Sequence, residues 1–126
     1  MTTPVESRPV VLLVDDDPAV RDSLTFALGF EGFDLRTYES AEDLLEAGAP
    51  PEAVCLIADL QLPGVNGLTL VARLRSAGAT IPAILITTNP STLVRARALA
   101  HGAAIVEKPL LTDGLLDALR RVAPAA

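Results

Sequence analysis

The chain has 126 residues, a length typical of one compact domain, and half of its residues are hydrophobic, which excludes a chain that is disordered as a whole. Ten Lys and Arg against sixteen Asp and Glu give a net charge of -6, the wrong sign for a nucleic-acid backbone, so we expect no direct nucleic-acid binding. The single cysteine excludes an internal disulfide, and since no apolar run approaches the roughly 20 residues that span a bilayer, we expect a soluble, cytoplasmic protein without a membrane partner.

Five short apolar runs alternate with five segments of helical periodicity along the chain. In chain order, the predicted strands cover residues 10–14, 33–38, 54–58, 81–87 and 103–106. The predicted helices begin at residues 18 and 40, and then cover about 66–77, 91–100 and 112–122. This alternation predicts an α/β fold with a doubly wound parallel sheet of five strands and helices on both faces.

The first two helices carry recognisable start signals. Asp17 is the expected cap of a helix that has Pro18 at its first position. Ser40 and Asp43 have the spacing of a capping box, and that helix is expected to end near Gly48.

Polar residues follow the predicted strands at their carboxyl ends, where open parallel sheets bind their ligands. Asp15 and Asp16 follow the first strand, Asp59 follows the third, Thr87 closes the fourth and Lys108 follows the fifth. Carboxylates within about 5 Å of one another repel by roughly 3 kcal/mol per pair, so this edge requires a cation. Oxygen ligands without His or Cys favour Mg²⁺. A carboxylate such as Asp59, beside this cation and an ammonium group, is suited to attack phosphorus.

Four motifs, in this order, resemble the receiver domain of two-component response regulators, and within that family the FixJ-like group. They are VDDD at residues 14–17, IADLQLPG at 57–64, ILIT at 84–87 and EKP at 107–109. The resemblance covers nearly the whole chain, from Val10 to about Val122, and implies the CheY-like, flavodoxin-like fold with strand order 2-1-3-4-5. The chain would then be a single receiver domain over residues 1–126, with a core at about 9–122 and no output domain.

The resemblance implies that Asp59 is phosphorylated by a sensor histidine kinase or a histidine phosphotransfer protein. Lys108 would pair with the phosphoaspartate, the Thr87 hydroxyl would move to meet it, and Pro109 would follow a cis peptide bond. Such a domain signals by contact with another protein. It is not expected to be an enzyme, because it catalyses only its own phosphorylation and dephosphorylation.

Mg²⁺ is the cofactor that the resemblance implies. Asp16, Asp59 and the backbone carbonyl of Gln61 would bind it directly, and Asp15 would reach it through a water molecule. Asp17 is left out of this set, because a residue directly before Pro18 is better interpreted as a helix cap.

Three positions depart from the family pattern. Thr88 stands where Ala or Gly is common, Ile105 where an aromatic ring usually turns inward, and Leu110 where Phe often follows Lys-Pro. These departures concern transmission of the signal and the rate of phosphoryl transfer.

Two other functions stay open at this point. A pseudo-receiver would keep the fold but act as a constitutive binding module, as the three departures suggest. A phosphohydrolase of the haloacid-dehalogenase type would use Asp15 as nucleophile and Asp17 as general acid. That family also needs a second acidic pair and a cap segment, whereas Asp113 and Asp117 lie on a predicted helix and no insertion is present.

Overall fold

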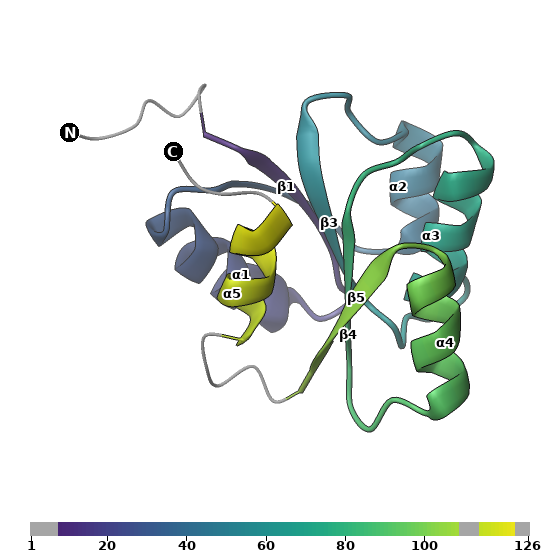
Figure 1. Ribbon diagram of the computed structural model, residues 1–126. Helices are drawn as coiled ribbons and strands as arrows, with labels where there is room; N and C mark the ends of the chain where they lie inside the picture. The colour runs from purple at the N-terminus through teal and green to yellow at the C-terminus, as the bar shows by residue number, and fades with distance from the viewer. Residues whose placement is uncertain (1–7, 109–113, 123–126) are drawn as a thin grey trace.

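The computed structural model describes residues 8–108 and 114–122, which form a parallel sheet with the strand order β2-β1-β3-β4-β5 (Figure 1). The strands are β1 (Val10–Val14), β2 (Asp34–Tyr38), β3 (Ala53–Asp59), β4 (Ala83–Thr87) and β5 (Ala103–Glu107). The helices are α1 (Pro18–Phe30), α2 (Ala41–Ala47), α3 (Gly67–Ser76), α4 (Thr92–Ala100) and α5 (Gly114–Val122). The predicted fold class and strand order are confirmed.

The sheet separates two hydrophobic cores, with α1 and α5 on one face and α2, α3 and α4 on the other (Figure 1). Side chains of β1 alternate between them: Leu13 packs with residues of α1 and α5, and Leu12 with residues of α2 and α3. All five residues of β1 are buried, because this strand has a neighbour on each side and helices on both faces. Each such buried Leu contributes about 1.5–3 kcal/mol.

Four helices are preceded by a cap residue, whose side-chain oxygen accepts a hydrogen bond from a backbone N–H of the first turn. The pairs of cap oxygen and backbone N–H are Asp17 with Ala19, Ser40 with Asp43, Asn66 with Thr69, and Ser91 with Val94. The predicted start of α1 at Pro18 is confirmed. The predicted starts at residues 40, 66 and 91 are each one residue early, because these residues are the caps themselves.

Two predicted strands begin too early, for local reasons. The Phe33 N–H donates to the Leu28 carbonyl at 3.1 Å, so Phe33 belongs to the turn that ends α1, and β2 begins at Asp34. Pro82 has no N–H to donate, and β4 begins at Ala83. The predicted start of the last helix at residue 112 lies outside the described residues.

The register of the sheet brings the polar strand ends to one edge. Asp59 pairs with Ile86, and Thr87 pairs with Glu107, so β3, β4 and β5 end side by side. Within the described ranges 8–108 and 114–122, no helix is long and apolar enough to cross a membrane.

Candidate functional site

Asp15 directly follows β1 and is 2% exposed. Its N–H donates to the Tyr38 carbonyl at 3.2 Å, which continues the pairing of β1 with β2. Its own carbonyl accepts a hydrogen bond from Nη1 of Arg21 at 2.7 Å. Its carboxylate oxygen Oδ1 accepts from the N–H of Asp17 at 2.9 Å. The residue is therefore fixed at its main chain and at its carboxylate.

Asp59 is the last residue of β3 and is 5% exposed. Its Oδ1 accepts a hydrogen bond from the N–H of Gln61 at 2.9 Å, and its Oδ2 accepts one from Nζ of Lys108 at 2.6 Å. The following N–H, of Leu60, donates to the Ile86 carbonyl at 2.9 Å and holds the chain against β4. Both carboxylate oxygens of Asp59 are thus oriented by donors from this chain.

Lys108 and Thr87 are brought to the same edge by β4 and β5. The backbone N–H of Lys108 donates to the Thr87 carbonyl at 2.9 Å. The Lys108 side chain is one-third exposed, whereas Thr87 is buried. The Thr87 hydroxyl donates to the Thr88 carbonyl at 3.2 Å. The structure therefore pairs Asp59 directly with Lys108 and places Thr87 beside them with its hydroxyl engaged by the next residue.

The charges of the edge act on one another. Burial of the Asp15 carboxyl raises its pKa above the usual value, and the negative charges of Asp59 and Asp16 raise it further. The hydrogen bond from Asp17 and the charge of Lys108 work in the opposite direction. Asp16 itself is exposed. Asp15 is therefore close enough to both Asp59 and Asp16 to be repelled by their charges, a repulsion that a bound cation relieves.

The donor set fits a hard divalent cation. Within residues 8–108 and 114–122, no three His, Cys, Asp or Glu residues gather into a complete metal cluster. Mg²⁺ does not need one, because it keeps several waters and is bound through one or two carboxylates. Asp15 and Asp59 supply two buried carboxylates, and only oxygen ligands are at hand, since Cys55 is buried within β3 and His101 follows the far end of α4.

Two further residues, which lie outside the four sequence motifs, shape this site. Gly67 begins α3 against Asp59, and a Cβ atom at this position would lie 2.5 Å from the Asp59 carbonyl oxygen. A glycine at the start of a predicted helix is a signal of such close approach. The second is Arg21, which lies near the N-terminus of α1. The helix dipole disfavours a cation at this end of a helix, and this is the one feature of the sequence that singles out Arg21.

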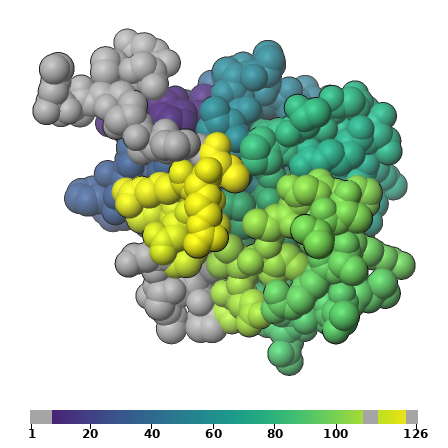
Figure 2. All heavy atoms as spheres, viewed as in Figure 1, coloured from purple at the N-terminus to yellow at the C-terminus, as the bar shows by residue number. Residues whose placement is uncertain are grey.

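Two of the three departures from the family pattern, Thr88 and Ile105, lie within the described residues. Thr88 is exposed on the loop before α4. Ile105 is partly buried and packs against the core with α2, α3 and α4. Figure 2 shows the segments of α4, β5 and α5 on one face of the molecule. Arg95 of α4 forms an ion pair with Glu107 of β5. Leu110 lies outside the described residues, as does Pro109 with its expected cis peptide bond.

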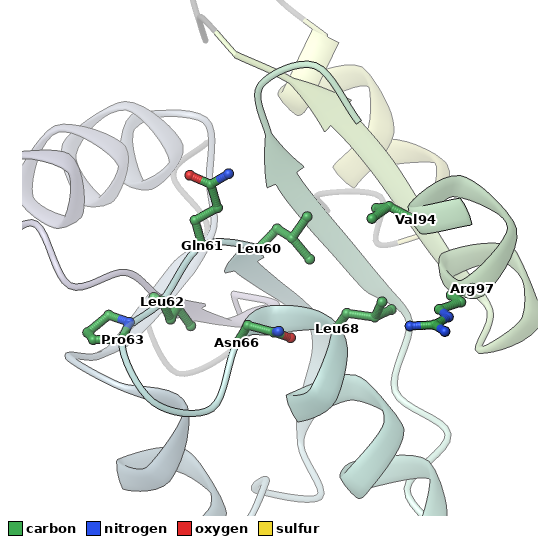
Figure 3. Close-up of a pocket in the computed structure, with 8 residues that line it drawn as sticks. All are labelled: Leu60, Gln61, Leu62, Pro63, Asn66, Leu68, Val94 and Arg97. Atoms are coloured by element: carbon green, nitrogen blue, oxygen red, sulfur yellow. The ribbon is translucent and has the colours of Figure 1, made fainter. Parts of the chain in front are cut away.

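A groove of about 630 Å³ lies next to the site, between the segment that follows β3 and helix α4 (Figure 3). Its lining residues are Leu60, Gln61, Leu62, Pro63, Asn66, Leu68, Val94 and Arg97. Asp59 is not among them, so the groove is a neighbouring surface.

The sequence matches one family model, described as "Response regulator receiver domain", over residues 11–120. The transcriptional regulatory protein FixJ of Azorhizobium caulinodans is 36% identical over 116 residues, which cover 91% of this chain and 54% of that protein. The C4-dicarboxylate transport transcriptional regulatory protein DctD of Pseudomonas aeruginosa is 34% identical, over 94% of this chain and 26% of that protein. The chain thus spans about half the length, or less, of these relatives.

Solved structures with the same fold include the response regulator StyR, which is 33% identical with a TM-score of 0.83 and is matched over 93% of this chain and 60% of that one. The crystal structure of FixJ-N is 32% identical with a TM-score of 0.79, over 90% of this chain and 92% of that one. The response regulator TrrA of Thermotoga maritima, solved in complex with Mg²⁺ and BeF, is 26% identical with a TM-score of 0.76, over 90% and 98%.

Proposed function

Because the chain belongs to the response regulator receiver family of two-component systems, we propose that Asp59 accepts a phosphoryl group from a sensor histidine kinase or a histidine phosphotransfer protein. This is a signalling family and not a family of enzymes in the usual sense. The observation that carries the proposal is the buried Asp59 carboxylate, which has the Lys108 ammonium 2.6 Å from one oxygen and the Gln61 N–H 2.9 Å from the other.

In the proposed reaction, a bond forms between an Asp59 carboxylate oxygen and the phosphorus of the donor. The P–N bond of the phosphohistidine breaks, and its electron pair returns to the imidazole nitrogen. A phosphoryl group adds negative charge at this edge. Lys108, already in contact with Asp59, balances part of this charge, and the Thr87 hydroxyl exchanges the Thr88 carbonyl for a phosphoryl oxygen.

Asp16, Asp59 and the Gln61 backbone carbonyl are the proposed Mg²⁺ ligands, with Asp15 acting through a water molecule. When bound, Mg²⁺ neutralises charge on the transferred oxygens. The proposal is supported by the interacting charges of Asp15, Asp16 and Asp59, which favour a cation at this position. It is also supported by TrrA, a structural neighbour that was solved with Mg²⁺ and BeF.

The proposed partners are proteins. The Lys108 side chain, one-third exposed beside Asp59, marks the side from which a histidine presented by another protein would approach. FixJ and DctD are transcriptional regulatory proteins, so the expected absence of nucleic-acid binding, drawn from the net charge of -6, has no support from the relatives. That charge describes this chain alone, and these relatives are longer.

Intact-mass measurement after treatment with acetyl phosphate and Mg²⁺ tests the proposal. We expect the wild-type protein to gain about 80 Da, the mass of one phosphoryl group. Asp59→Asn should not gain it, whereas Asp22→Asn, which neutralises an exposed acid of α1, should. If the wild type forms no adduct, a pseudo-receiver is favoured instead. Continuous turnover of phosphate esters would favour the phosphohydrolase.

A further inference from the structure

Arg21 lies in the first turns of α1, yet its side chain turns back to the loop of residues 15–17. Its Nη1 donates to the Asp15 carbonyl at 2.7 Å, and its backbone N–H donates to the Asp17 carbonyl at 3.0 Å. The side chain is 15% exposed. Arg21 therefore closes a ring around this loop, with one bond from its side chain and one from its main chain.

The position of this guanidinium group is unfavourable in free energy, and the hydrogen bond to the Asp15 carbonyl offsets that cost. A cation close to the N-terminus of a helix opposes the helix dipole, and burial removes part of its hydration. Its second contact is weak: Nη2 lies 3.7 Å from Oε1 of Glu39, whose side chain is 78% exposed. An ion pair so open to solvent contributes little. The Asp15 carbonyl is the contact that accounts for the inward conformation of the side chain.

The bond also fixes the direction of an acid that the site needs. The Asp15 N–H is held by the Tyr38 carbonyl, and the Asp15 C=O is held by Arg21, so both hydrogen-bonding groups of its main chain are engaged. Without Arg21, the carbonyl of this buried residue loses its donor. The repulsion of the Asp15 carboxylate by Asp16 and Asp59 then acts on a loop in which the Asp15 carbonyl is no longer held.

We propose that Arg21 is a positioning residue, which holds the loop of residues 15–17 closed so that the Asp15 and Asp16 carboxylates face Asp59. This inference rests on the proposed function, because it concerns the same site. Arg21 touches no reacting atom in this arrangement and acts through the main chain of Asp15. It is expected to matter most in the metal-free protein, where no cation offsets the repulsion of the acids.

Amide exchange in the metal-free protein tests loop closure directly. The Asp17 N–H donates to the Asp15 carboxylate, so its solvent exchange, followed by NMR, reports whether the loop is closed. We expect Arg21→Met to speed this exchange by about fivefold. Arg73→Met, which removes an exposed arginine from α3, should leave it unchanged. Exchange at Leu12, in the centre of β1, reports global opening. It should stay far slower than Asp17 exchange in every variant, which shows that Asp17 exchanges through local opening of the loop.

Magnesium affinity of the unphosphorylated protein, measured by NMR titration, is the second readout. We expect Arg21→Met to weaken Mg²⁺ binding by about threefold to tenfold, and Glu39→Gln and Arg73→Met to leave it unchanged. If Arg21→Met does not fold, Arg21→Lys keeps the charge without the planar fork and should speed Asp17 exchange by about threefold.

Asp17 exchange in Arg21→Met that stays within twofold of the wild type would overturn the inference. So would an equal effect of Glu39→Gln, since the ion pair and not the carbonyl bond would then hold the loop. If the wild-type protein binds no Mg²⁺, the metal part of the proposed function fails. The exchange measurement still decides the role of Arg21 in that case.

Discussion

The Asp15 carboxyl destabilises the folded chain at neutral pH. Burial and the charges of Asp59 and Asp16 raise its pKa in the folded state above the usual value of 3.8. Between these two values the folded state binds more protons than the unfolded state. Protonated Asp15 therefore favours the folded state, and this contribution is complete below pH 3.8. It is lost as the pH rises through the raised pKa of the folded state, and it is absent at neutral pH.

Asp15→Asn is accordingly expected to raise the melting temperature of the metal-free protein at neutral pH. The variant removes the buried charge, while the Asn side-chain oxygen can still accept from the Asp17 N–H. We expect a rise of a few degrees by scanning calorimetry, since 1 kcal/mol shifts the melting temperature of a domain of this size by about 4 °C.

Asp22→Asn removes the same charge from an exposed position of α1 and should have little effect. Added Mg²⁺ should raise the melting temperature of the wild type more than that of Asp15→Asn. A lower melting temperature of Asp15→Asn would contradict this account of the site.

Single residues of the site differ in how well the sequence predicts them. The pairing of Asp59 with Lys108 joins residues 49 positions apart, yet it could be anticipated, because parallel strands end at a common edge. The inward turn of Arg21 could not be. A long side chain near the start of a helix can point to solvent or to the loop, and the residues around it do not decide between these conformations.

The first residue of helix α3, Gly67, packs directly against the backbone of Asp59. The Gly67 N–H donates to the Leu60 carbonyl at 3.0 Å, and the Asp59 carbonyl fills the space that a Cβ atom would need. Any side chain at this position must displace the main chain of β3 or of α3. The segment after the Pro63-Gly64 turn therefore needs a glycine for packing.

Two glycine substitutions test this packing against a matched control. Gly67→Ala should lower the free energy of unfolding by about 2 kcal/mol, because its Cβ atom meets backbone. Gly29→Ala, in α1, adds a Cβ atom that meets nothing within 4 Å, and should raise the free energy by about 0.5–1 kcal/mol. Urea denaturation measures both. Equal effects of the two substitutions would contradict the close approach of α3 to Asp59.

At the scale of elements, the order and type of the helices and strands within residues 8–108 and 114–122 could be predicted, whereas several ends could not. Apolar periodicity and helix caps are local signals, and they fixed the starts of α1 and α2 to within one residue. The start of β2 depends on whether the Phe33 N–H closes the preceding helix or joins the sheet. That competition is decided by tertiary packing, which an apolar residue does not reveal.

At the scale of the whole molecule, the fold shields Cys55 from solvent. This residue is fully buried in the core between the sheet and helices α1 and α5. Burial raises the pKa of its thiol from 9.0 to about 12. The unfolded chain therefore releases this proton near pH 9, while the folded chain keeps it until about pH 12. The contribution of this group to stability is complete below pH 9 and declines as the pH rises from there.

Cys55 is thus expected to report global unfolding. At about pH 8, a thiol reagent should label the native protein at least about 1000-fold more slowly than the urea-unfolded chain, because only opened molecules react. The labelling rate should rise with urea in parallel with unfolding followed by circular dichroism. Rapid labelling of the native protein would show that this core opens locally.

Long-range ion pairs at the molecular surface are the part of the structure that the sequence predicts least. Arg120 of α5 pairs with Glu31 at the end of α1, 89 positions away in the chain. Such contacts form only after the helices have packed on the sheet, so apolar patterning predicts the packing and not the pair.

The two outer strands, β2 and β5, also bear on how the protein behaves at high concentration. Arg36 of β2 pairs with Glu52, and Glu107 of β5 pairs with Arg95. A strand from another molecule that added to either side of the sheet would have to bury these charges or separate the pairs. The open sheet thus carries, at both of its borders, a barrier to aggregation through strand addition.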